Sequence, residues 1–152
     1  MSSMQTGIEA VRKTLVVNCT PEQAFETFTR DVGTWWPLHE HSIGGKEIVE
    51  VVWEEQVGGR IYERHTDGGE GEWGRVLAWE PPSRFVMSWY PGKDDSQATE
   101  LEVRFSPEGD GTRVDLEHRG WEGLGAAAAE ARQGYSEGWE SVLAGFADRA
   151  KG

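Results

Sequence analysis

The sequence predicts an α+β domain in which a curved, seven-stranded antiparallel sheet wraps round one long C-terminal helix. Three observations support this fold class. Seven segments alternate apolar and polar residues, which is the period of a half-buried strand. The last segment instead repeats its apolar residues every three or four positions, which is typical of an amphipathic helix. The order of elements also lacks strand–helix–strand alternation, so neighbouring strands are expected to be antiparallel.

The first strand begins near Ile8, and a short helix follows it. Val11, Leu15 and Val17 fall on one side of the alternation. Residues 20–23 (Thr-Pro-Glu-Gln) place threonine at the N-cap, proline at the first helical position and glutamine three residues after the cap, which forms a capping box. Two short helices are expected in this region, which ends at the Trp-Trp-Pro of residues 35–37. Residues 1–7 are predicted to be a disordered terminus.

Six further strands are expected between residues 48 and 118, separated by turn signals. Glycine pairs mark turns at residues 58–59 and 68–69, and the second pair has the composition of a hairpin turn. Val49, Val51 and Trp53 share one side of their strand and are expected to face the interior. The pattern leaves open which side of residues 60–79 faces inward. The predicted strands are residues 48–54, 60–65, 73–79, 85–89, 101–105 and 114–118.

A long amphipathic helix is predicted over Ala126–Ala150, and it is the only element long enough to cover the sheet. Its apolar stripe consists of Tyr135, Trp139, Val142, Leu143, Phe146 and Ala150. Gly134, Gly138 and Gly145 each cost this helix about 1 kcal/mol in propensity. Either the apolar stripe offsets that cost, or the glycines allow another element to approach closely.

Length and charge exclude several classes of protein. The chain has 152 residues, which suits one domain, expected over residues 8–152. Its net charge of −12 disfavours binding to nucleic acids and to anionic membranes. A single cysteine excludes an internal disulfide framework, and no apolar run approaches the roughly 18 residues of a membrane span. We therefore expect a cytoplasmic protein that is a monomer or a weak homodimer.

Tryptophan is the main compositional bias, since eight tryptophans equal the five phenylalanines and three tyrosines combined. Indole rings on a cavity wall offer wide, flat contact and one N–H to orient a polar edge. Because eight indoles are hard to pack at the usual density of about 0.75, we predict a partly hollow interior that binds a bulky apolar or aromatic molecule. Plain core packing is the alternative for each residue. The candidate ligand-binding residues are Trp36, Trp53, Trp73, Trp89, His118, Trp121, Tyr135 and Trp139.

His118 is the one candidate for acid–base chemistry that the alternation places on the covered face. Tyr135 and Arg75 are its candidate partners in an enzyme. The alternative is a core histidine whose hydrogen bonds are satisfied by Tyr135 or by the backbone.

No metal or cofactor site is predicted. His39 and His41 suggest a metal by composition only, because zinc sites show further ligands. Cys19 ends a strand without a catalytic partner and is interpreted as a buried, inert thiol. The acidic residues mostly occupy outward positions and indicate a solvated surface.

Several short motifs, in this order, resemble a known family. They are Pro21-Glu22-Gln23-Ala24-Phe25, Trp35-Trp36-Pro37, Gly74-Arg75-Val76 leading to Glu80-Pro81-Pro82, Thr112-Arg113-Val114 with Glu117-His118, and Tyr135 with Gly138-Trp139. The chain resembles the START-like (birch-pollen-allergen-like, SRPBCC) superfamily, in the group of homologues of the heat-shock chaperone ATPase activator. In its last third it is also similar to enediyne self-resistance proteins of calicheamicin producers.

The resemblance implies a helix-grip fold with an elongated cavity between the sheet and the long helix. Family members bind lipids, polyketides and other bulky apolar molecules, and some are cyclases or aromatases. We therefore expect non-covalent binding of a polyketide-like or enediyne-like molecule, in bacterial natural-product biosynthesis or self-resistance. In the self-resistance reading, Gly120, Gly123 and Gly125 would offer backbone hydrogens to a bound diradical. A polyketide cyclase, aromatase or hydrolase and a chaperone-interaction module are the alternatives.

Overall fold

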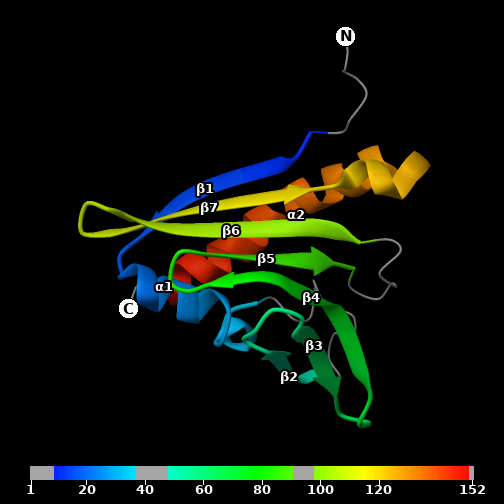
Figure 1. The fold of residues 1–152 in the computed structure, drawn as a ribbon, viewed down its shortest axis with the longest axis horizontal. Coiled ribbons are helices and arrows are strands. Elements are labelled where there is room, and N and C mark those ends of the chain that lie inside the picture. The colour runs from blue at the N-terminus through cyan, green and yellow to red at the C-terminus, as the bar shows by residue number, and fades with distance from the viewer. Residues whose placement is uncertain (1–8, 37–47, 91–97, 151–152) are drawn as a thin grey trace.

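The computed structural model describes residues 9–36, 48–90 and 98–150, and these form a curved seven-stranded sheet with a long helix across it (Figure 1). The strands are β1 (Val11–Val17), β2 (Ile48–Trp53), β3 (Arg60–His65), β4 (Glu70–Glu80), β5 (Arg84–Trp89), β6 (Thr99–Glu108) and β7 (Gly111–Arg119). The helices are α1 (Pro21–Phe28), η2 (Val32–Thr34), η5 (Trp121–Ala127) and α2 (Ala128–Arg149). The strand order is β1-β7-β6-β5-β4-β3-β2, and every neighbouring pair is antiparallel. The predicted helix-grip fold is confirmed.

The capping box that the sequence predicts starts helix α1. The Gln23 backbone N–H donates to Thr20 Oγ1 at 3.2 Å, and the Thr20 N–H donates to Gln23 Oε1 at 3.1 Å. These two bonds satisfy backbone donors that a helix start otherwise leaves free. The buried face of α1 then carries Ala24, Phe25 and Phe28 into the core between the sheet and α2.

One side of the sheet is covered and the other is exposed to solvent, as the alternation predicts. On β6 and β7, Leu101, Leu116 and Val114 are buried at 1% exposure or less. The prediction for Val49 is wrong: this side chain is 62% exposed. The pairing of β2 with β3 shifts between Ile48 and Glu50, and such a bulge turns one residue out of the alternation.

Strand β4 begins at Glu70, three residues earlier than predicted. The structure also shows which side chains of β3 and β4 face the interior. Ile61 and Glu63 of β3 and Trp73 of β4 are all exposed by 2% or less. A shift in pairing between Ile61 and Tyr62 changes the phase of the two strands relative to each other. Simple alternation along residues 60–79 therefore does not identify the inner face.

Helix α2 begins at Ala128, two residues after the predicted start, because η5 precedes it. Gly125 in η5 has a φ of +61°, a conformation that favours glycine and interrupts the helical path. The stripe residues Trp139, Val142 and Phe146 are buried against the sheet and α1. Gly145 allows a close approach, since a Cβ there would lie only 2.7 Å from the Trp35 carbonyl oxygen.

Candidate functional site

Four tryptophans from separate segments meet between the sheet and α2, and we call them the indole cluster. They are Trp36, after η2; Trp73, on β4; Trp89, on β5; and Trp139, on α2. The Trp36 ring centroid lies 4.8 Å from that of Trp73, 5.9 Å from that of Trp89 and 5.8 Å from that of Trp139. The cluster places flat aromatic faces from the sheet and the helix in one region of the interior.

His118 of β7 adjoins the indole cluster and is fully buried. The Trp139 indole N–H donates to His118 Nδ1 at 3.0 Å, and His118 Nε2 lies 2.6 Å from Thr99 Oγ1. Because an indole N–H can only donate, Nδ1 is the acceptor, and the neutral ring carries its proton on Nε2. Thr99 Oγ1 in turn donates to the Trp89 carbonyl oxygen at 3.3 Å. Both imidazole nitrogens are thus engaged.

Burial keeps this histidine neutral, since it lowers the pKa of His118 to about 3. Its ring also packs against Trp121 and Tyr135, at centroid distances of 4.2 Å and 5.0 Å. Burial raises the pKa of the Tyr135 hydroxyl. Arg75, the other expected partner, is exposed and pairs with Glu72. The arrangement fits the core-histidine alternative better than an acid–base role.

A second polar group lies on the same concave face, at β3. Glu63 is fully buried, and its Oε1 accepts the Trp73 indole N–H at 2.7 Å. Its other oxygen, Oε2, lies 2.7 Å from His65 Nε2. The His65 side chain keeps 17% of its surface exposed. A buried carboxylate next to a partly exposed imidazole is an arrangement that can hold and move a proton.

Two indole N–H groups in the interior make no hydrogen bond to the described part of the chain. They belong to Trp53 and Trp89, which are 9% and 5% exposed. A buried donor without an acceptor is costly, so an occupant with a carbonyl or hydroxyl oxygen would recover that cost. Trp53 lies apart from the indole cluster and packs on Phe85, with a centroid distance of 4.9 Å.

The structure thus gathers the candidate residues into three places. Trp36, Trp73, Trp89 and Trp139 form the indole cluster; His118, Trp121 and Tyr135 adjoin it; Trp53 belongs to a separate aromatic group. The sequence reasoning missed Glu63 and His65. Ile61, Glu63 and His65 alternate along β3 and so share one side of the strand. The sequence places Glu63 and His65 in the interior only if the inward side of β3 is already known.

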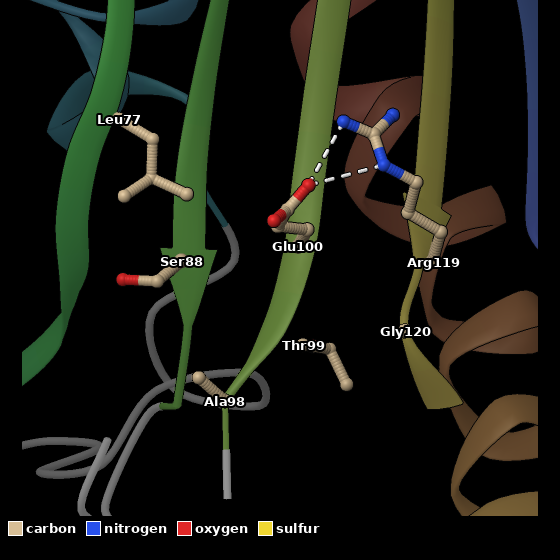
Figure 2. Close-up of a pocket in the computed structure, with 7 residues that line it drawn as sticks. All are labelled: Leu77, Ser88, Ala98, Thr99, Glu100, Arg119 and Gly120. Atoms are coloured by element: carbon tan, nitrogen blue, oxygen red, sulfur yellow. Dashed lines mark hydrogen bonds and ion pairs between the residues drawn. The ribbon is translucent and has the colours of Figure 1, made fainter. Parts of the chain in front are cut away.

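Two pockets lined by described residues lie outside the indole cluster. One, of about 400 Å³, lies on the outer face of the sheet among Leu77, Ser88, Glu100 and Arg119. Figure 2 shows these side chains on adjacent strands, with the Arg119 guanidinium donating to Glu100 at 2.9 Å. The other, of about 300 Å³, lies between α1 and the end of α2. A cavity inside the indole cluster stays a prediction.

The outer face is mostly charged, but one of its acids is buried. Glu102 is 7% exposed and accepts hydrogen bonds from Arg84, Arg104 and Arg119 at 2.7–2.9 Å. Burial opposes its charge, but the bonds from Arg104, Arg119 and Arg84 lower the pKa of Glu102 to about 2. This acid is therefore not the solvated residue that the sequence pattern suggests, and it ties β5, β6 and β7 together.

No group of metal-ligating side chains occurs among the described residues, and His39 and His41 lie outside them. Cys19 is a free thiol that is buried as expected, and burial raises its pKa. Within the described ranges, none of the helices has the length and apolar character needed to cross a membrane.

The sheet order, the long helix and the aromatic interior define a START-like, helix-grip protein. The chain belongs to the family described as Activator of Hsp90 ATPase homolog 1-like protein, whose model matches residues 18–151. No curated protein matches the chain.

Several solved structures are similar to this chain, and one of them is named as an enzyme. An anthrahydroquino-gamma-pyrone synthase, Txn09, solved as a complex, is 37% identical, with 95% of this chain and 99% of that chain covered and a TM-score of 0.63. The Aha1 dimer from Colwellia psychrerythraea is 17% identical over 95% and 97% of the two chains, with a TM-score of 0.66. DynU16, from the dynemicin biosynthetic locus, is 15% identical over 93% of this chain and 46% of that one, with a TM-score of 0.64. The last two likenesses support the fold alone.

Proposed function

We propose that this protein binds a polycyclic aromatic polyketide between the sheet and α2 and closes a pyrone ring on it. The observation that carries the proposal is the 37% identity, over nearly the full length of both chains, to an anthrahydroquino-gamma-pyrone synthase. The sequence pattern favours binding alone, whereas this similarity favours a cyclase. Enediyne binding and a role in self-resistance stay predictions.

The interior has the chemistry that such a ligand requires. The indole cluster brings flat rings from the sheet and from α2 together, and a fused aromatic system packs well against such rings. The N–H group of Trp89, which belongs to this cluster, is a donor for a quinone or ketone oxygen. Burying about 300 Å² of ligand surface gives about 7 kcal/mol before the costs of association, which allows micromolar binding.

The test has a binding arm and a turnover arm. A dihydroxyanthraquinone is titrated into the protein while tryptophan fluorescence is followed, with palmitate as the non-aromatic control. We expect saturable quenching with a micromolar Kd and a rise in Tm with the anthraquinone, and a much weaker response to palmitate. An anthraquinone that carries a β-diketone beside a hydroxyl group is then supplied as substrate, and pyrone formation is followed by absorbance. Absence of both saturable quenching and turnover would refute the proposal.

A further inference from the structure

A buried carboxylate on the concave wall is the feature that the fold explains least. Glu63 is fully buried on β3, and its partner Trp73 belongs to the indole cluster, where the proposed ligand binds. Removing a carboxylate from water costs several kcal/mol, and apolar replacements of buried ion pairs are often as stable or more stable. Stability alone therefore gives no reason for an acid at this position.

The chemistry of the neighbours separates Glu63 from the other buried acid of the sheet. Glu102, on the outer face, is held by three guanidinium groups, which do not release protons near neutral pH. Glu63 has an imidazole among its partners, a side chain that can both accept and donate a proton. The contact of 2.7 Å between Glu63 Oε2 and His65 Nε2 requires a proton between the two atoms.

His65 connects this carboxylate with the solvent. Its Nε2 faces Glu63, whereas its Nδ1 lies toward the turn between β3 and β4, 3.7 Å from where a Cβ on Gly69 would stand. The side chain is 17% exposed, and Glu63 has no exposed surface. The two side chains therefore connect the aromatic interior with the surface of the molecule. The Glu63 carboxylate lies inside, and the His65 imidazole lies at the surface.

We propose that Glu63 is the catalytic acid–base of this protein and that His65 is a positioning residue that orients it and exchanges its proton with water. The proposal rests on the proposed ring closure. Each oxygen of a carboxylate can accept more than one hydrogen bond, so Glu63 can accept from a substrate hydroxyl while it keeps its bonds to Trp73 and His65. Neither residue was among the candidates from the sequence.

The step proceeds without an oxidant or a cofactor. Glu63 removes the proton of an aryl hydroxyl as that oxygen forms a C–O bond to the distal carbonyl carbon of a β-diketone side chain. The π pair of that carbonyl moves to its oxygen, which takes the proton back from Glu63 to give a hemiketal. Glu63 then removes a proton from the carbon between the remaining carbonyl and the hemiketal carbon, a C=C bond forms, and the hemiketal hydroxyl leaves as hydroxide, which takes this proton from Glu63 to become water. The products are a pyrone and one water molecule.

The test compares Glu63→Gln with Glu102→Gln, since both acids are buried and only the first faces the aromatic interior. With the hydroxyanthraquinone β-diketone as substrate, we expect Glu63→Gln to lower kcat at least 100-fold while the Kd for dihydroxyanthraquinone stays within about threefold. Glu102→Gln should keep the wild-type kcat. A Glu63→Gln enzyme with kcat within threefold of wild type overturns the proposal. If the wild type does not turn this substrate over, the proposed ring closure itself has failed.

Two further variants complete the test. His65→Gln keeps a side chain able to hydrogen-bond Glu63 but cannot pass a proton to water, so its kcat should fall at least tenfold with the Kd unchanged. A His65→Gln enzyme with the wild-type kcat would contradict the role given to His65. If Glu63→Gln does not fold, Glu63→Asp is measured instead, because it withdraws the carboxylate by one methylene. We expect its kcat to fall at least tenfold, and wild-type turnover in this variant overturns the proposal.

Discussion

His118 illustrates how an interior can hold a titratable residue in one charge state. Trp139 donates to its Nδ1 and Thr99 Oγ1 accepts the hydrogen bond from its Nε2–H, while burial lowers its pKa to about 3 from an ordinary value of 6.5. A residue selected from the sequence for chemistry thus has its hydrogen-bonding capacity used within the core. Glu63, which was not a candidate from the sequence, contacts a second titratable side chain, that of His65.

The low pKa of His118 predicts a loss of stability on acidification. Between pH 6.5 and about 3 the unfolded chain binds a proton at this residue and the folded chain does not, so the free energy of unfolding falls as the pH falls. One proton corresponds to a slope of up to about 1.4 kcal/mol per pH unit. Urea unfolding at several pH values should show this slope in the wild type and a flatter one in His118→Asn. Equal slopes in the two proteins would contradict the assignment.

At the scale of elements, the regular alternation identifies strands, but the bulges between them decide which side chains face inward. Val49 continues an apolar alternation and is nevertheless exposed, since the β2–β3 pairing shifts beside it. The pairing of β3 with β4 shifts as well, so the alternation along these strands did not predict that Glu63 faces the interior. A bulge depends on the partner strand as much as on the strand itself, so a single sequence segment does not reveal it.

Two glycines of α2 give a matched prediction about the packing of this helix. A Cβ at Gly145 would lie 2.7 Å from the Trp35 carbonyl oxygen, whereas a Cβ at Gly134 would meet nothing within 4 Å. Gly134→Ala should therefore stabilise the protein by about 0.5–1 kcal/mol through helix propensity. Gly145→Ala should destabilise it by about 1–3 kcal/mol, because α2 must move away from Trp35. Chemical denaturation measures both, and a stabilising Gly145→Ala would disprove the close approach.

The whole molecule divides its chemistry between two faces of one sheet. The concave face, under α2, carries the indole cluster with the buried polar groups Glu63 and His118. The outer face carries charge, and its arginine–glutamate contacts span β5, β6 and β7 around Glu102. The net charge of −12 is thus compatible with an apolar, aromatic interior.

The contacts of Glu102 predict how the molecule as a whole responds to strong acid. Its pKa of about 2 lies below the ordinary value of 4.5, so its charged contacts stabilise the fold above pH 4.5 and are lost as the pH falls toward 2. Hydrogen bonds to charged groups contribute about 1.5–3 kcal/mol. Glu102→Gln should be less stable than wild type at pH 7, and the gap should narrow between pH 4.5 and 2, as thermal unfolding can measure. A gap that stays constant with pH would argue against this charge state.

The sequence by itself determined the fold class, the capping box of α1, the apolar stripe of α2 and the surplus of tryptophan, because local periodicity and composition carry this information. Tertiary structure alone decided that Trp36, Trp73, Trp89 and Trp139 meet, and that Glu63 touches both Trp73 and His65. These contacts depend on sheet curvature and on bulges between neighbouring strands. Both arise from pairing between distant segments, so no pattern within one segment contains them.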